Sequence, residues 1–298
     1  MKKITDLDVK SMDMMEEKAA ENWDLVITPR KKWYDLQLRE VWRYRDLISL
    51  FVRRDFVSRY KQTILGPLWL IIQPILNSLV FTVVFGNIAR LSTDGLPPML
   101  FYMSATVLWS YFSNCLTGTS QTFIQNAQLF GKVYFPRLVM PVSIVISNLI
   151  TLAIQFALFM GFRFYFSAVN AGIHFTTWAW AFPLLILLMA GLGLGFGIIV
   201  SSLTTKYRDL NYLVSFGVSL WMYATPVLYP VSSIPESWRW IAVVNPITPI
   251  VETFRAGFLG QGTVSWARLG YSGAFMLVVL IIGVVIFNRV EKTFIDTV

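Results

Sequence analysis

The segment "RYKQTILGPLWLIIQP" (59–74) changes its chemistry within a few residues and indicates where the chain enters a membrane. Arg59 and Lys61 close a stretch crowded with charge, and no Asp, Glu, Lys or Arg occurs in the next 28 residues. Pro67 suits the first turn of a helix, because the N–H that it lacks would have no partner there. Trp69 suits the level of the lipid head groups, where amphipathic rings are enriched. We therefore predict that a membrane-spanning helix begins at this seam.

Five further charge-free runs follow, and together the six runs indicate a multi-pass membrane protein. Of the 298 residues, 55% are hydrophobic and 14% are charged, whereas about 25% are charged in a typical soluble protein. Each run holds about 20 apolar residues, enough for a helix to cross about 30 Å of hydrocarbon. We predict an all-α polytopic fold with a six-span domain over 62–290 and a cytoplasmic tail over 291–298. The spans are expected near 64–86, 98–118, 138–162, 178–203, 211–230 and 269–288.

The distribution of Lys and Arg predicts the orientation of these spans. If the N-terminus is inside, the inner segments hold 20 of the 25 basic residues and the outer segments hold five. Basic residues favour the cytoplasmic side of a membrane, so we expect both termini in the cytoplasm. The net charge of +8 is then explained by topology, which argues against nucleic acid as a partner.

The region before the first span divides into two parts. Residues 1–32 mix acids and bases with few large apolar groups, which predicts a cytoplasmic N-terminal arm. Residues 33–61 carry apolar side chains near helical spacing with arginines between them, which predicts a basic amphipathic helix in the plane of the membrane surface. Such a helix either anchors the chain or docks a cytoplasmic subunit. Its candidate docking residues are Arg53, Arg54, Asp55 and Arg59.

The connection between the second and third spans is longer than a turn requires. The segment 121–132 places amide side chains beside apolar ones and is followed by an X-Pro break, which suits a short helix at a cytoplasmic bend. It is either a plain loop or a contact surface. The residues of that surface would be Gln121, Gln125, Asn126, Gln128 and Lys132.

Five prolines interrupt the segment between the fifth and sixth spans, 224–260. Its apolar pieces of 10–14 residues are too short to span a bilayer and are typical of re-entrant or interfacial helices. Four charged residues within it, Glu236, Arg239, Glu252 and Arg255, need water or one another. We expect either a structured lid in the outer half of the membrane or a loop on the lipid surface.

Several motifs of energy conversion and catalysis are absent from the sequence. There is no G-x-x-x-x-G-K-[ST] motif for ATP binding, and no carboxylate lies inside a predicted span, as ion-coupled carriers would require. The single cysteine, Cys115, and the single histidine, His174, argue against a metal centre. "GLGLGFG" (191–197) offers two small-xxx-small pairs for close helix packing, rather than a nucleotide site. Something other than these motifs must therefore supply the energy.

Aromatic residues are frequent inside or beside the predicted spans. Their rings can stack on sugars while polar tips bind hydroxyl groups, although membrane anchoring and helix packing also explain single cases. The candidates for a carbohydrate path are Trp69, Trp109, Tyr111, Phe112, Trp221, Tyr223 and Tyr229.

Three blocks of the sequence resemble the membrane subunit of type-2 ABC exporters, in particular the polysaccharide-export permeases for O-antigen, capsule or teichoic acid. They are "FVRRDFVSRYKQTILGPLWLIIQPI" (51–75), "NAQLFGKVYFPRLVMPV" (126–142) and "TPVLYPVSSIPESWRWIAVVNPITPIVETFRAGFLG" (225–260). "TTKYRDL" (204–210) fits the short inner loop, and the resemblance extends over about 35–290. Residues 1–30 match no part of the pattern.

The resemblance implies a homodimer around a channel in the bacterial inner membrane, with two cytoplasmic ABC ATPase subunits that bind ATP and magnesium. It implies that 33–61 is an interface helix, that 121–132 is a coupling helix and that 232–260 forms an outer gate. The chain itself would bind no cofactor or metal and would not be an enzyme. The gate residues would be Pro235, Glu236, Trp238, Arg239, Trp240, Asn245, Pro246, Glu252 and Arg255.

We therefore expect the permease of an ATP-driven exporter of a lipid-linked, O-antigen-like polysaccharide. A type-2 ABC exporter of a small molecule or lipid is the first alternative, because it would share this fold. An autonomous channel or a membrane-embedded enzyme is the second, and purified chain that is active without an ATPase would favour it.

Overall fold

The computed structural model of the protein describes residues 38–61, 63–130, 132–133, 135–169, 172–204 and 209–294. The regular structure in these ranges is helical, with no strand, in agreement with the predicted all-α class. The predicted arm (1–32), the start of the predicted interface helix and the last four residues lie outside the described part. The α-helices are α2 (Leu38–Arg43), α3 (Arg45–Tyr60), α4 (Trp69–Phe81), α5 (Pro98–Ser120), α6 (Thr122–Gln125), α7 (Ala127–Phe130), α8 (Val139–Val169), α9 (Phe182–Thr204), α10 (Leu210–Ala224), α11 (Arg239–Val244), α12 (Thr248–Leu259) and α13 (Trp266–Phe294). Shorter helical turns are η1 (Gly66–Leu68), η2 (Thr82–Ile88), η3 (Thr177–Ala181), η4 (Val231–Ser233) and η5 (Glu236–Trp238).

The seam at Gly66-Pro67 forms the beginning of the first long helix. Gly66 has a φ of 50°, a left-handed conformation that glycine adopts without strain and that redirects the chain after α3. Pro67 then occupies the first turn of η1, as predicted. η1, α4 and η2 together make a continuous helix from Gly66 to Ile88, whose last part, Thr82–Ile88, is a π-helix.

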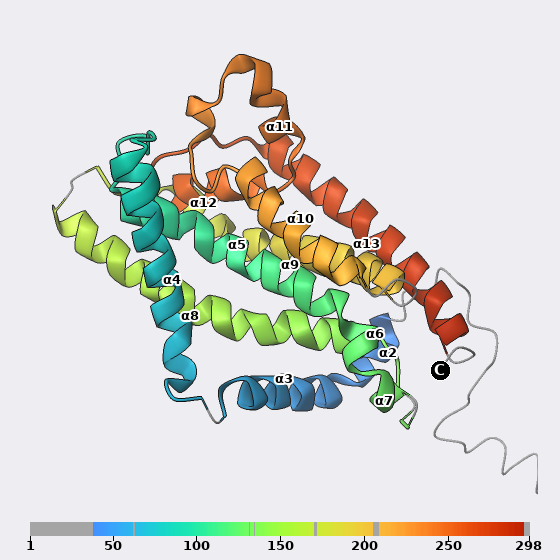
Figure 1. Ribbon diagram of the computed structural model, residues 1–298. Coiled ribbons are helices and arrows are strands. Elements are labelled where there is room, and N and C mark those ends of the chain that lie inside the picture. Colours follow the sequence, from blue (N-terminus) through green and yellow to red (C-terminus); the bar gives the residue numbers. More distant parts are fainter. Residues whose placement is uncertain are drawn as a thin grey trace, which may run out of the picture. The chain divides into compact units, whose positions relative to one another are not determined.

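Helix α5 is the centre of the fold. It packs against α4, α8, α9, α10 and α12, and Figure 1 shows it running between these helices. Of its 23 residues, 16 are buried. A helix that is enclosed by neighbours on nearly all sides needs no lipid-facing stripe, which explains how α5 accommodates Ser, Thr and Asn along its length.

The glycines of α9 let this helix approach two neighbours closely. A Cβ atom at Gly193 or Gly197 would lie 2.7 Å from Cys115 Cβ and 2.5 Å from Thr119 Cβ, both on α5. The alternate glycines face α13, where a Cβ atom at Gly195 would lie 2.9 Å from Val279 Cγ1. The two predicted small-xxx-small pairs are thus confirmed, one for each neighbouring helix.

Four helices in the described part are long and apolar enough to cross a membrane: Gly66–Ile88, Val139–Val169, Thr177–Thr204 and Trp266–Val290. They correspond to four of the six predicted spans. The other two predictions, 98–118 and 211–230, correspond to α5 and to α10. Helix α10 has only 15 residues, about 22 Å at 1.5 Å per residue. It ends early because Thr225 precedes Pro226 and takes an extended conformation.

Candidate functional site

Helix α3 is attached to the rest of the protein by its apolar side. Ile48 and Phe51 are buried in a cluster with Phe123 and with the residues that lead into α8, and the rings of Phe51 and Phe135 are 5.9 Å apart. Phe123 stacks in turn on Phe287 of α13, at 4.7 Å. Arg53 is exposed, whereas Arg54 lies over the ring of the buried Phe51, with its Cζ atom 4.8 Å from the ring centroid. The apolar residues of the amphipathic pattern are therefore those that pack against the rest of the protein.

The predicted docking residues of α3 meet the predicted coupling segment in one pocket. The pocket has a volume of about 330 Å³ and lies between α3, the α6–α7 region and the start of α8. Arg54 and Asp55 form an ion pair at its edge, with Arg54 Nη2 2.7 Å from Asp55 Oδ1. Segments about 70 residues apart in the sequence thus form one polar surface. From the predicted set, Arg54, Asp55, Arg59, Gln125 and Asn126 line the pocket.

The other predicted docking residues do not line this pocket. Arg53, Gln128 and Lys132 are exposed. Gln121 is half-buried, and its side chain accepts a hydrogen bond from the amide of Gln125. The predicted single helix over 121–132 is divided into α6 and α7, because the chain leaves the helical conformation at Asn126.

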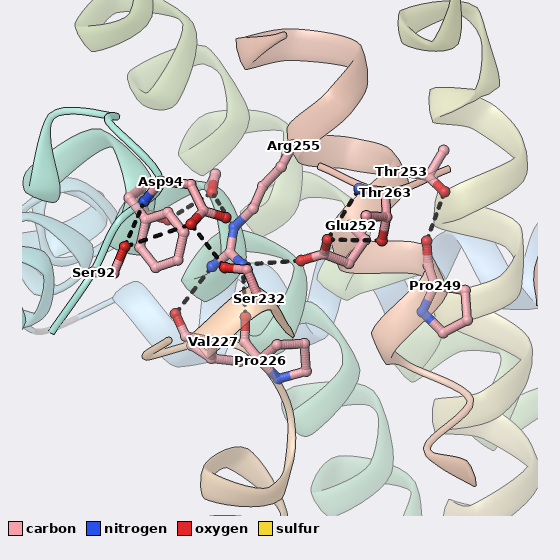
Figure 2. A network of polar contacts seen from close by, with 12 residues as sticks. Ser92, Asp94, Pro226, Val227, Ser232, Pro249, Glu252, Thr253, Arg255 and Thr263 are labelled. Atoms are coloured by element: carbon pink, nitrogen blue, oxygen red, sulfur yellow. Dashed lines mark hydrogen bonds and ion pairs between the residues drawn. The ribbon is translucent and has the colours of Figure 1, made fainter. Parts of the chain in front are cut away.

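A buried cation, Arg255, organises the other end of the helices. Its guanidinium donates hydrogen bonds to the carbonyl oxygens of Pro226 (2.8 Å) and Val227 (3.1 Å), just after α10. It also donates to Ser104 Oγ of α5 at 3.3 Å and lies 3.7 Å from the ring centroid of Phe101. Figure 2 shows Pro226 and Val227 beside the guanidinium group. Arg255 therefore joins α12 to α5 and to the end of α10.

Glu252 balances the charge of Arg255, from which its carboxylate is 3.5 Å away. The second carboxylate oxygen accepts hydrogen bonds from the backbone N–H (3.1 Å) and hydroxyl (3.3 Å) of Thr263. This pair links α12 to the loop before α13 (Figure 2). The sequence indicated that these charges need one another, but it gave no signal for the distant partners Ser104, Pro226 and Thr263.

The predicted gate residues separate into a buried and an exposed group. Asn245 is buried and its amide donates to Thr225 Oγ1 at 2.8 Å, while Ser272 of α13 donates to the carbonyl oxygen of Pro246 at 2.7 Å. These contacts fix the turn between α11 and α12. The buried group is Asn245, Pro246, Glu252 and Arg255, and the exposed group is Pro235, Glu236, Trp238, Arg239 and Trp240.

The predicted aromatic path does not form one continuous surface in the single chain. Trp109 and Phe112 of α5 are buried against Trp221 of α10, with ring centroids 6.5 and 5.2 Å from that of Trp221. Tyr111 is also buried, so a glycan reaches these α5 residues only if helices separate. Trp69, at the start of α4, is exposed and lies apart from them.

Tyr223 and Tyr229 lie instead beside the predicted gate. The hydroxyl of Tyr229 donates to the carbonyl oxygen of Tyr223 at 2.7 Å. Both residues line an apolar pocket of about 390 Å³, together with Pro235 and Trp238 of the exposed gate group. One part of the aromatic set is therefore adjacent to the predicted gate, and another part packs between α10 and α5.

The predicted docking and gate residues thus lie in separate parts of the structure, each with its own pocket. Within the described residues no three His, Cys, Asp or Glu side chains are placed to hold a metal ion. The family model of the ABC-2 type transporter matches residues 46–259. The chain belongs to the ABC-2 type transporter family. As a member, it is a transport subunit rather than an enzyme, and ATP hydrolysis belongs to a separate subunit.

Several relatives resemble this ABC-2 transporter chain over most of their length. The O-antigen export system permease protein RfbA of Klebsiella pneumoniae is 28% identical over 249 residues, which cover 84% of this chain and 93% of the relative. The protein of the same name from Myxococcus xanthus is 29% identical over 228 residues, 74% of this chain and 83% of the relative. The capsule polysaccharide export inner-membrane protein CtrC of Neisseria meningitidis serogroup A is 23% identical over 258 residues, 83% and 91% respectively.

Proposed function

We propose that this chain is the permease subunit of an ATP-driven exporter that moves a lipid-linked, O-antigen-like polysaccharide across the bacterial inner membrane. The observation that carries the substrate class is the alignment with an O-antigen export permease over 84% of this chain and 93% of the relative. The capsule export relative has a substrate of the same chemical class by its name. The relatives therefore support polysaccharide as the substrate, whereas the family alone indicates only a transporter.

The energy comes from two cytoplasmic ATPase subunits, which bind ATP and magnesium. The pocket between α3 and α6–α7 supports this part of the proposal, because it gathers charged and amide side chains from two segments on one exposed surface. A partner that binds there contacts both the interface helix and the coupling segment. Movement of the ATPase is then transmitted through α8, on which α3 packs, towards the helices of the core.

The chain crosses the membrane six times in this proposal, with both termini in the cytoplasm. The two spans beyond the four long apolar helices are α5 and α10. Burial of α5 among its neighbours removes the need for a fully apolar surface. Helix α10 crosses together with the residues that follow it, and η4, η5, α11 and α12 re-enter the outer half of the membrane as the gate.

Two copies of the chain pair around the export channel. The faces that support this pairing are the exposed sides of α4 and α10, which carry large apolar and aromatic groups. On α10 the exposed fractions are 83% for Tyr212, 64% for Phe216 and 54% for Tyr223. On α4, Trp69 is 46% exposed. These rings are available to a partner copy or to a glycan, whereas the buried aromatic residues of α5 support the helices behind them.

Depletion of the protein from its host tests the proposed substrate. We expect lipid-linked glycan to accumulate on the cytoplasmic side of the inner membrane and surface polysaccharide to be lost. Re-expression of the wild-type chain should reverse both effects. Normal surface polysaccharide with no trapped intermediate, in a host without a second exporter of this kind, would exclude the polymer and leave a small molecule or lipid as cargo.

A further inference from the structure

A polar pocket of about 590 Å³ lies at the end of the helices that carries α11 and α12. Its lining comes from the loop before α5, from η4, α11 and α12, and from the start of α13. Hydroxyl and amide groups of Ser232, Gln261, Thr263 and Ser265 contribute to this lining. The pocket is thus built from segments spread over 175 residues of sequence, and it is separate from the aromatic pocket beside Tyr223.

The acidic and the basic residues of this pocket differ in whether they have partners in the protein. Glu252 is held by Arg255 and Thr263, and Asp94 accepts a hydrogen bond from Ser232 Oγ at 2.8 Å, as Figure 2 shows. The acidic groups therefore have partners in the protein. Arg239 and Arg268 also line the pocket, and neither guanidinium has a hydrogen bond or ion pair within the described part of the chain. Among the residues that the structure describes, these two cations are therefore donors without a partner, and they lie among hydroxyl groups.

Exposed tryptophans place these two arginines at a membrane surface. Trp238 and Trp240 flank Arg239 in the sequence and are 60% and 61% exposed. Trp266, two residues before Arg268, is 67% exposed. Exposed tryptophan rings are enriched at the level of the lipid head groups. The pocket therefore opens where the phosphate groups of a bilayer lie.

We propose that this pocket binds the head group of an anionic phospholipid. The planar guanidinium groups of Arg239 and Arg268 match the geometry of a phosphate and donate paired hydrogen bonds to its oxygens. The surrounding hydroxyl and amide groups suit a head group such as glycerol, which carries hydroxyls of its own. Only the leaflet rests on the proposed function: with the termini in the cytoplasm, the lipid belongs to the outer leaflet. A bound lipid would connect α11 to α13 across the lid.

Native mass spectrometry of the full chain in detergent tests the proposal with added phosphatidylglycerol or phosphatidylcholine. We expect the wild-type chain to retain phosphatidylglycerol about tenfold more strongly, since basic residues near a membrane favour anionic lipid. The double variant Arg239→Gln/Arg268→Gln should lose this preference. Arg239→Gln alone and Arg268→Gln alone should each weaken it, and the control Arg90→Gln, which also removes one charge but at an exposed residue that does not line the pocket, should keep the preference.

Equal retention of the two lipids by the wild-type chain, or an unchanged preference in the double variant, would overturn the proposal. Displacement of phosphatidylglycerol by millimolar inorganic phosphate, together with equal retention of both lipids, would assign the pocket to free phosphate instead. An apparent Tm of the double Gln variant equal to that of the wild type checks that its fold is intact. If that Tm is lower, the variant Arg239→Lys/Arg268→Lys replaces it in the assay. Because this variant keeps both charges, it should retain part of the preference for phosphatidylglycerol. The assay contains neither glycan nor nucleotide, so its failure leaves the proposed export function unaffected.

Discussion

Arg255 shows how one residue accommodates a charge in an otherwise apolar region. Its side chain is 2% exposed, and a buried cation is tolerated only when its donors are satisfied and its charge is balanced. Two backbone carbonyls, Ser104, Glu252 and the face of Phe101 together meet this requirement. Since the carbonyls belong to the residues just after α10, the same contacts also hold the end of that helix.

The substitution Arg255→Met tests this role. It leaves the Glu252 carboxylate buried without its cation, and such an uncompensated charge costs about 3–5 kcal/mol of stability. Glu252→Gln should cost less, because Arg255 keeps its carbonyl partners and Thr263 keeps an acceptor. The double variant Arg255→Met/Glu252→Gln should be more stable than Arg255→Met alone, because it leaves no buried charge without a counter-charge. Apparent Tm values in detergent measure the relative stabilities of the three variants. An Arg255→Met variant as stable as the wild type would contradict the proposed role of Arg255.

At the level of elements, the sequence predicts packing best where a residue type has few structural roles open to it. Glycines at alternate positions of α9 predicted close approach, and each pair faces a different helix. Charge-free runs predicted six spans, of which four correspond to helices long and apolar enough to cross a membrane. The sequence did not predict whether Trp109 and Phe112 are buried, because an aromatic ring suits a channel, an interface and a core equally well. Only the packing of α10 on α5 decides that they are buried.

Gly197→Ala should weaken the contact between α9 and α5. The added Cβ atom would lie 2.5 Å from Thr119 Cβ and 3.1 Å from the carbonyl oxygen of Leu116. Overpacking of this kind costs about 1–3 kcal/mol. The matched control is Gly217→Ala on α10, where no atom lies within 4 Å and alanine should stabilise the helix by about 0.5–1 kcal/mol. Thermal unfolding of both variants decides, and equal Tm values would argue against the close approach.

Charge reversal on α3 tests the docking surface. Arg54→Glu/Arg59→Glu places repulsive charge beside Asp55 in the pocket, and we expect the partner ATPase to bind about tenfold more weakly, a loss of about 1.4 kcal/mol. Arg45→Glu is the control, because Arg45 lies on the same helix but does not line the pocket. Co-purification of the ATPase with each variant measures the effect. Equal recovery with the docking and control variants would show that the partner does not use this pocket.

At the scale of the whole molecule, the predicted docking surface and the predicted gate lie at opposite ends of the helices. Figure 1 shows α3, α6 and α7 at one end and α11 at the other, with α5, α9 and α13 between them. An exporter requires this separation, because the energy-coupling surface and the exit must face different compartments. The positive-inside pattern of the sequence supplies the expected direction, with α3 in the cytoplasm.

Single-cysteine labelling tests this direction in cells. Lys132→Cys and Gln261→Cys introduce thiols at exposed positions near α7 and before α13. The native Cys115 is fully buried and should not react, so it need not be removed. A membrane-impermeant maleimide should label Gln261→Cys in intact spheroplasts, and Lys132→Cys only after the membrane is permeabilised. The opposite pattern would place the pocket between α3 and α6–α7 outside the cell, where no cytoplasmic ATPase reaches it, and the proposed coupling would fail with the topology.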